Sequence, residues 1–457
     1  MDGRKINMSF PSNFAWGAAT SAYQIEGAVE QDGRGASVWD AFCAQPGRVH
    51  AHEDGRVACE HYRRYREDVA TMREIGLKAY RFSVAWPRVM PEGAGVVNGA
   101  GLGFYDRLVD ELLAAQIEPW LTLFHWDFPL ALHRRGGWLN PDSPRWFADY
   151  ARVVVDKLSD RVTRWITLNE PQCFVGLGHE TGVHAPGERL ALSQVLLAAH
   201  HAMLAHGRAV ETIRERAKRP PRVGWAPTGD IPVPATESVD DIAAAREAYG
   251  AIVKPGVWNH AWWLEPVLHG CYPEQGRRLH GAAVPAFTAE EMRTIAQPLD
   301  FLGLNIYNGV FCRGGRKGDV EQLPFPTGFP QTHNHWNVMP GALRWGPRFA
   351  HERSGLPIVI TENGMAGHDW VARDGAVHDA HRIDYLGRYL GGLKQAIADG
   401  VPVEGYFAWS LMDNFEWAEG YRYRFGLVHV DYATQQRTLK DSAHWYRDVI
   451  RTNGAGI

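Results

Sequence analysis

The stretch PIVITENG, at residues 357–364, is a short apolar run that ends in a carboxylate. The β-branched residues in its middle favour a buried strand. Glu362 stands where the apolar run stops, and the Asn-Gly pair that follows is a turn signal. A charge at the end of a buried strand costs free energy unless it has partners or a chemical role. From this stretch alone a structural carboxylate is the more common explanation, so the rest of the chain must decide.

Seven further segments resemble this one, because they are short, mostly apolar and rich in β-branched or aromatic residues. They lie at residues 14–24, 79–86, 119–126, 164–170, 222–226, 301–307 and 405–412. None alternates cleanly between polar and apolar residues, which is typical of strands buried on both faces. Stretches of helical period separate them at residues 60–75, 105–113, 145–158, 192–214, 344–353 and 383–398, and residues 444–450 follow the last strand.

Eight strand–helix units in one chain without a linker predict an α/β fold of the (β/α)8 barrel type. We expect residues 1–457 to form a single barrel domain. Three further segments, 35–59, 228–257 and 310–340, are rich in Gly, Pro, His and Asp. They are expected to be long loops over the C-terminal face of the barrel, where such folds carry their active sites.

The overall composition limits the classes of partner. Lys and Arg number 48 and Asp and Glu 52, a net charge of −4, which argues against nucleic acid or an anionic membrane as partner. Cys43, Cys59, Cys173, Cys271 and Cys312 form no CxxC pair, which indicates a reducing compartment without a disulfide framework or a zinc site.

No secretory signal follows the N-terminus, and the most apolar helical stretch, 195–205, is too short to span a bilayer. We therefore expect a cytoplasmic protein without a membrane partner. The glycines at 176–182 lack the dinucleotide-binding spacing, and the two histidines at 333 and 335 lack a nearby acid or Cys, so neither a cofactor nor a metal is expected. The sequence does not specify an oligomeric state.

Polar side chains stand at or just beyond the ends of the predicted strands, and the barrel should bring them together at one face. They are Gln24, Arg81, His125, Asn169, Glu170, Asn305, Tyr307, Glu362 and Glu416. A barrel needs few such groups for stability, and the 18 Trp residues also exceed what a core requires. This combination predicts a ligand-binding face that is rich in aromatic surfaces.

Glu170 and Glu362 end the fourth and seventh predicted strands. Two carboxylates in an aromatic pocket suit the cleavage of glycosidic bonds, in which one attacks the anomeric carbon and the other transfers a proton. While Glu362 is charged, Glu170 is harder to ionise and keeps its proton near neutral pH. When a glycosyl-enzyme forms, that charge disappears and Glu170 can act as a base.

Three motifs carry a resemblance to a known family: TLNEP at 167–171, ITENG at 360–364 and WSLMDNFEW at 409–417. They resemble the signatures of family 1 glycoside hydrolases, and in particular of its bacterial β-glucosidases. The similarity extends from FAWG at 14–17 to FGL at 425–427. The motifs occur in the right order and in matching barrel units, so the resemblance is specific.

The resemblance implies a role for each site residue. It makes Glu362 the nucleophile and Glu170 the acid/base, with Asn169 on the sugar 2-hydroxyl. The nucleophile would be supported by Arg81, Tyr307 and Asn305. The sugar would be bound by Gln24, His125, Trp126, Asn169, Trp409, Glu416, Trp417 and Phe425. The leaving-group site would be formed by Trp336, Cys173, Leu177 and His184.

The expected activity is retaining hydrolysis of terminal β-D-glucosyl residues from a small glycoside or oligosaccharide. Galactosides and fucosides are expected as further substrates, because few hydrogen bonds discriminate at O4. One alternative is a 6-phospho-β-glycosidase, which Glu416 opposes because its carboxylate would repel a phosphate. The other is a non-catalytic sugar-binding barrel, since fold does not fix function.

Overall fold

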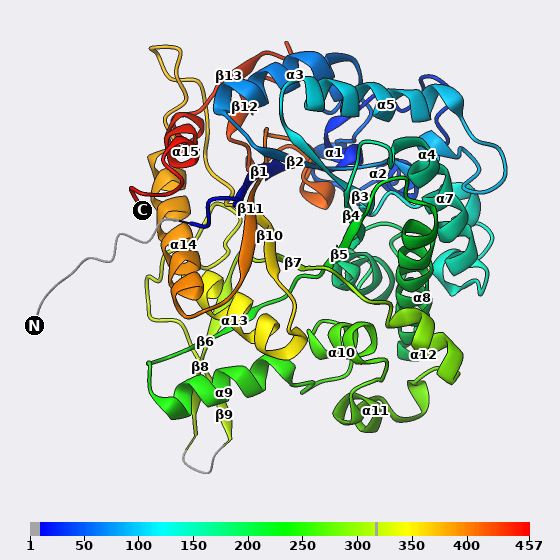
Figure 1. Ribbon diagram of the computed structural model, residues 1–457, viewed down its shortest axis with the longest axis vertical. Helices are drawn as coiled ribbons and strands as arrows, with labels where there is room; N and C mark the ends of the chain where they lie inside the picture. Colours follow the sequence, from blue (N-terminus) through cyan, green and yellow to red (C-terminus); the bar gives the residue numbers. More distant parts are fainter. Residues whose placement is uncertain (1–9, 316–318) are drawn as a thin grey trace, which may run out of the picture.

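The computed structural model describes residues 10–315 and 319–457. Its central sheet has eight parallel strands in the order β5-β4-β3-β2-β1-β11-β10-β7 (Figure 1). Their bounds are β1 Ala15–Ala19, β2 Ala79–Ser83, β3 Glu118–Phe124, β4 Arg164–Asn169, β5 Arg222–Ala226, β7 Leu302–Asn305, β10 Ile358–Asn363 and β11 Val403–Trp409. Backbone hydrogen bonds from Asp300 N to Val223 O, 2.8 Å, and from Asn305 N to Pro227 O, 3.0 Å, bring the two edges together. The predicted (β/α)8 barrel is confirmed.

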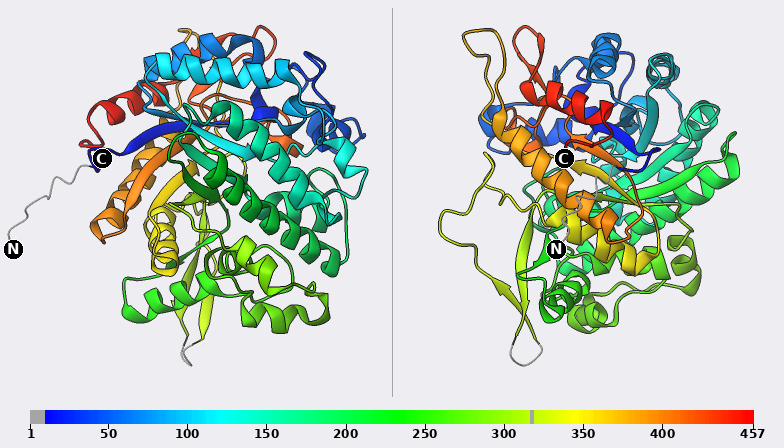
Figure 2. Two further views of the ribbon diagram at one scale, coloured as in Figure 1. Left: turned by 45° about the vertical axis from the view of Figure 1, so that its right-hand side comes forward. Right: turned by 60° about the vertical axis from the view of Figure 1, so that its left-hand side comes forward.

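Helices surround the strands, as the two views of Figure 2 show. The predicted helices are present as α3 His61–Ile75, α5 Gly99–Ala114, α7 Ser143–Leu158, α8 Leu192–Arg216, α13 Ala342–Ser354, α14 Ala380–Ala398 and α15 Asp441–Arg451. The largest extension is at the start of α5, where the Asn98 side chain accepts a hydrogen bond from Ala100 N, 3.2 Å, and caps the helix. Among the described residues, no helix is both long and apolar enough to cross a membrane.

Several short elements interrupt the connections between these units. They are α1 Ala22–Ile25, α2 Val38–Cys43, η1 His50–His52, α4 Trp86–Val89, α6 Leu130–His133, η2 Gly137–Leu139, the π-helix η3 Gln172–Glu180, α10 Ala261–His269, α11 Glu274–His280, η4 Gly281–Ala283, α12 Ala289–Ile295, η5 Trp417–Glu419, β12 Val428–Val430 and β13 Arg437–Leu439. The sequence did not predict α10–α12, because Pro266, Gly270 and Pro273 divide this region into pieces too short to show a helical period.

The three segments expected to be long loops contain short helices and strands in their described parts. Residues 35–59 contain α2 and η1, and residues 228–257 contain β6 Ile231–Pro234 and α9 Val239–Gly250. Strand β8 Gly309–Gly314 pairs with β6 and with β9 Val320–Leu323 in a small separate sheet. Two prolines in the four residues of β6 and a weak apolar face on α9 concealed these elements. Residues 316–318 of the third expected loop lie outside the described residues.

Several predicted strands are also too long, because the chain stays apolar after the strand has ended. Residues 22–24 of the first predicted strand belong to α1, and residue 86, the last of the second predicted strand, begins α4. These short helices are buried, so their composition resembles that of a strand. Burial rather than backbone conformation set the apolar pattern there.

The barrel interior is filled by residues of unequal size. Trp120 lies 5.4 Å from Phe301 and 5.1 Å from Phe407 between ring centroids, and small residues such as Ala19 and Ala79 complete this cluster. A larger apolar cluster packs the helices onto the outside of the sheet. The interior is therefore a packed core, and any ligand must bind at an end of the barrel.

A buried charge network supports the segment that follows β11. Lys440, with a relative exposure of 0%, binds Asp413 and Asp369, each at 2.6 Å. Asp413 also accepts hydrogen bonds from Arg424, 2.6 Å, and from Gly426 N, 3.0 Å. Asp369 also binds Arg382 of α14 at 2.6 Å, so the network holds Asp413, in the segment after β11, against α14 and the start of α15.

Substitution Lys440→Met tests this support. It leaves two buried carboxylates without their shared cation, so we expect the free energy of unfolding to fall by about 3–5 kcal/mol in chemical denaturation. Arg278→Gln, which removes an exposed ion pair with Glu274, is the control and should leave the unfolding midpoint unchanged. A Lys440→Met protein as stable as the wild type would show that the network does not contribute to the free energy of unfolding.

Candidate active site

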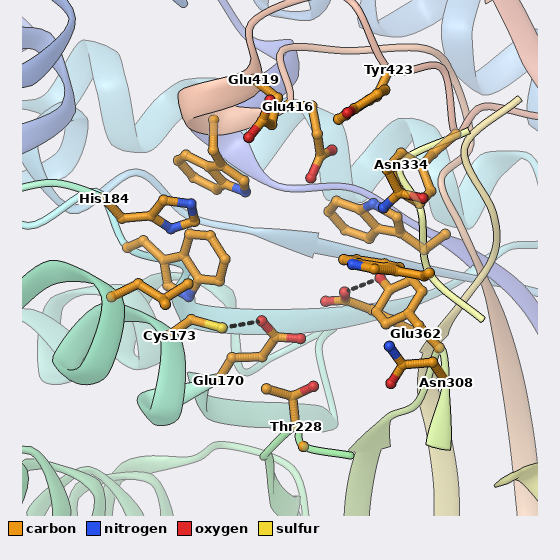
Figure 3. A pocket seen from close by; sticks show the side chains of 18 of the residues that line it. Glu170, Cys173, His184, Thr228, Asn308, Asn334, Glu362, Glu416, Glu419 and Tyr423 are labelled. Carbon is orange, nitrogen blue, oxygen red and sulfur yellow. Dashed lines mark hydrogen bonds between the residues drawn. The ribbon is translucent and has the colours of Figure 1, made fainter. Parts of the chain in front are cut away.

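A cavity of about 380 Å³ opens at the C-terminal ends of the barrel strands. Most sequence-predicted site residues line it: His125, Trp126, Glu170, Cys173, Leu177, His184, Tyr307, Trp336, Glu362, Trp409, Glu416, Trp417 and Phe425. Gln24, Arg81, Asn169 and Asn305 lie behind this lining and contact it through hydrogen bonds. In Figure 3, Glu170 and Glu362 point into the same space, and Glu416 reaches it from another side.

Glu362 is the penultimate residue of β10 and is 3% exposed. Arg81 Nη1 lies 2.6 Å from its Oε1, and the Tyr307 hydroxyl donates to its Oε2 at 2.7 Å. Burial raises the pKa of Glu362, while the charge of Arg81 and both hydrogen bonds stabilise the ionised form and act in the opposite direction. Both carboxylate oxygens are thus held in fixed positions by donors.

Glu170 directly follows β4, at a backbone φ of +44°. Asn305 Nδ2 donates to its Oε1 at 2.8 Å, and the Cys173 thiol donates to its Oε2 at 3.1 Å. Burial, and after it the charge of Glu362, raises the pKa of Glu170 to about 7. Glu170 can therefore hold a proton near neutral pH and release it again when its surroundings change.

Asn305 connects the strands that carry the two carboxylates. Its Nδ2 also donates to Asn169 Oδ1 at 2.9 Å, and its Oδ1 accepts from the Thr361 hydroxyl at 2.7 Å. The sequence assigned Asn305 to the support of Glu362, which remains a prediction, and in the structure its Nδ2 donates directly to the carboxylate of Glu170. Local sequence contains no signal for this choice between two nearby carboxylates.

Asn169 and His125 form a second hydrogen-bonded pair. Arg81 Nη2 donates to Asn169 Oδ1 at 2.6 Å, and Asn169 Nδ2 lies 3.0 Å from His125 Nε2. Since the amide nitrogen is a donor, His125 Nε2 must accept and His125 Nδ1 must carry the proton. Burial lowers the pKa of His125 well below its ordinary value, and Nδ1 has no partner among the described residues. A neutral N–H donor is thereby left for a ligand.

Glu416 is the third carboxyl group of the cavity. Burial, and then the charges of Glu362 and Glu170, raises its pKa to about 8. Gln24 Nε2 lies 3.4 Å from Glu416 Oε2 and 2.9 Å from the Phe415 carbonyl oxygen. Because three carboxyl groups share one poorly solvated space, they resist simultaneous ionisation.

Aromatic rings form much of the remaining wall. Trp417 lies 4.5 Å from Trp126 and 6.0 Å from His125 between ring centroids, and Trp409 lies 5.7 Å from His125. On another side, Trp336 lies 5.0 Å from Tyr307. A few oriented polar groups among aromatic faces are typical of a small-molecule binding site.

Sequence reasoning missed several residues that line the cavity: Thr228, Gly229, Asp230, Trp258, Asn308, Asn334, Glu419 and Tyr423. Asn308 and Tyr423 stand within two residues of predicted site residues, so a wider window around each motif would have included them. Trp258 and Thr228 lie in or beside a segment interpreted as a loop, and no local signal marked them. Among the described residues, no group of three or more His, Cys, Asp or Glu is placed to hold a metal ion.

Comparison with known proteins agrees with this geometry. The family model described as glycosyl hydrolase family 1 matches residues 6–455. Beta-glucosidase A of Thermotoga maritima is 43% identical over 446 residues, covering 97% of this chain and 98% of the relative. The 1,4-beta-D-glucan glucohydrolase of Thermotoga neapolitana is 42% identical over 446 residues, covering 97% and 99%. The structure of the Thermotoga maritima beta-glucosidase in complex with glucoimidazole matches with a TM-score of 0.89 and 43% identity, covering 98% of this chain and 99% of that one.

These matches define the class of the protein as a glycoside hydrolase. More specifically, the chain belongs to glycosyl hydrolase family 1.

Cys173→Ala tests the hydrogen bond to Glu170. The thiol donates to the ionised carboxylate, so its removal destabilises that form and should raise the pKa of Glu170 by about half a pH unit. Titration of Glu170 by carboxyl-carbon NMR measures this, with Glu170→Gln to assign the signal. Cys312→Ala is the control, because this buried cysteine does not line the cavity. An unchanged or lowered pKa in Cys173→Ala would contradict the hydrogen bond.

Proposed function

We propose that this protein is a retaining β-glucosidase that removes terminal non-reducing β-D-glucosyl residues by double displacement. The observation that carries the proposal is that two carboxyl groups in one cavity have different hydrogen-bonding partners and different tendencies to ionise. Glu362 is bound by a cation and a phenol, whereas Glu170 has a pKa of about 7. The names of the relatives, beta-glucosidase A and 1,4-beta-D-glucan glucohydrolase, support the same substrate class.

In the first step, an oxygen of Glu362 attacks the anomeric carbon while Glu170 gives its proton to the glycosidic oxygen. The carbon–oxygen bond to the leaving group breaks, and a covalent glycosyl ester forms on Glu362. The hydrogen bonds from Arg81 and Tyr307 aim the attacking carboxylate and keep it ionised.

Formation of the ester removes the negative charge of Glu362. Since that charge contributes to the raised pKa of Glu170, its loss lowers this pKa and makes Glu170 a base. Glu170 then takes a proton from water, the resulting hydroxide equivalent attacks the anomeric carbon, and the ester bond breaks. The sugar leaves with its original configuration.

Recognition of the sugar is assigned to the polar groups around the carboxylates. Asn169 is proposed to contact the 2-hydroxyl, an interaction that strengthens in the transition state. His125 supplies a neutral donor, and Glu416, with a pKa of about 8, can both donate and accept at a hydroxyl. Hydrophobic faces and further contacts to the sugar come from Gln24, Trp126, Trp409, Trp417 and Phe425.

The leaving group is assigned to the space between Trp336 and the wall formed by Cys173, Leu177 and His184. Aryl glucosides and cello-oligosaccharides are both proposed as substrates, and so are β-galactosides and β-fucosides, because discrimination at O4 depends on few hydrogen bonds. The single domain over residues 1–457 and the cytoplasmic location remain predictions.

A matched set of aryl glycosides tests this function. We expect turnover of 4-nitrophenyl β-glucoside, β-galactoside and β-fucoside, and a kcat/KM at least about 100-fold lower for the β-glucoside 6-phosphate. The penalty arises because a phosphate dianion would lose its hydration in a poorly solvated cavity that already holds the charge of Glu362, and the ionised fraction of Glu416 adds to the repulsion. Glu416→Gln serves as the matched variant and should narrow the ratio between the glucoside and its phosphate.

Equal turnover of the glucoside and its 6-phosphate would instead favour a 6-phospho-β-glycosidase. Binding of glucosides without any turnover would favour the non-catalytic barrel.

A further inference from the structure

A second depression of about 420 Å³ lies beside the proposed active site. Glu419 lines both spaces. Val183 of the depression is the chain neighbour of His184 in the active-site wall, and Ala418 is likewise the neighbour of Trp417. Segments 182–184 and 417–419 therefore border both spaces, which makes the depression an outward continuation of the leaving-group side (His184 and Glu419 are labelled in Figure 3).

Cationic side chains dominate this depression, which Arg48, Arg189 and Arg422 line together with His50. Arg422 is paired with Glu419, so these two charges offset one another. For Arg48 and Arg189, no ion pair to a carboxylate occurs within the described part of the chain. Glu188 precedes Arg189 in the chain, but its carboxylate oxygens lie near two histidines instead, 3.7 Å from His133 Nε2 and 3.8 Å from His179 Nε2. The depression is therefore net positive.

Uncharged groups hold the two unpaired guanidinium groups in place. Arg48 Nη1 donates to the Gly182 carbonyl at 3.2 Å, its Nε donates to Gln45 Oε1 at 3.2 Å, and its Cζ lies 5.4 Å from the centre of the Phe42 ring. Arg189 Nε donates to the Thr181 carbonyl at 3.1 Å. These anchors orient the side chains without neutralising them, and each guanidinium keeps N–H groups for an anion.

We propose that this depression is a subsite for an anionic group on the leaving group, so that the enzyme favours β-glucosides whose aglycone ends in a carboxylate. The inference rests on the proposed β-glucosidase function. A planar carboxylate matches the donor geometry of guanidinium. The aglycone must be long enough to pass the wall formed by Leu177 and His184 before it reaches Arg48 and Arg189.

A pair of substrates that differ only in charge provides the test. These are the β-glucosides of 4-hydroxycinnamate and of 4-hydroxycinnamamide, which have the same length and ring. Exposed ion pairs stabilise by about 0.2–1 kcal/mol each, so two arginines should raise kcat/KM for the acid over the amide by roughly twofold to thirtyfold at low ionic strength. The ratio should fall toward one in 0.5 M NaCl, because salt screens exposed charges.

The double variant Arg48→Gln/Arg189→Gln should abolish the preference for the acid and leave kcat/KM for the amide and for 4-nitrophenyl β-glucoside unchanged. Arg278→Gln/Arg451→Gln, which removes two exposed arginines on α11 and α15, is the matched control and should keep the preference.

Three outcomes would overturn the inference. An acid-to-amide ratio of one or below in the wild type, or a preference that survives in the double variant, would refute the subsite while leaving the glucosidase function intact. A lack of turnover of every glucoside, the neutral ones included, would refute the proposed function and the subsite with it.

Discussion

The buried guanidinium of Arg81 is the interaction on which the site depends. Its side chain is 1% exposed and donates to Glu362 Oε1, to Asn169 Oδ1, to the Thr361 carbonyl and to the Thr122 hydroxyl. One residue of β2 thus joins β3, β4 and β10 at the end where the cavity opens. An isolated buried guanidinium is costly, and so is an isolated buried carboxylate, but each satisfies the other. The position of Glu362 and the orientation of Asn169 follow from this one group.

The electrostatic consequence is that the ionisation state of each carboxyl group in the cavity depends on that of the others. Arg81 is in direct contact with Glu362. Among the described residues, the hydrogen-bonding partners of Glu170 and Glu416 are neutral: Asn305 and Cys173 for Glu170, and Gln24 for Glu416. Burial and the charge of Glu362 raise both of their pKa values. Neutralisation of Glu362 by a sugar ester therefore changes the proton affinity of its neighbours, which is what a two-step hydrolysis needs from the same pair of residues.

Much of the fold and of the site was predictable from sequence, and the physical reasons differ by element. Strands buried on both faces gave unbroken apolar runs, and the polar residues that end them had to meet because the strands are parallel. Prediction of strands from apolar runs failed where burial rather than backbone conformation produces the run, as in α1 and α4. It also failed for β6, because its two prolines are unusual in a paired strand. The three side-chain hydrogen bonds of Asn305, the position of Trp258 in the cavity wall and the lack of a carboxylate partner for Arg48 and Arg189 in the described chain depend on how distant segments are arranged. No local pattern encodes them.

The most direct test of the catalytic assignment is azide rescue of Glu362→Ala, followed by stereochemical analysis of the product. Removal of the carboxylate should abolish turnover of aryl β-glucosides and leave room for azide at the anomeric carbon. The expected product is the α-glucosyl azide, formed by a single inversion. Glu170→Ala is the control and should yield the β-glucosyl azide, because azide then attacks a glycosyl ester on an intact Glu362. A β-glucosyl azide from Glu362→Ala, or undiminished turnover in that variant, would contradict the assignment of Glu362 as the nucleophile.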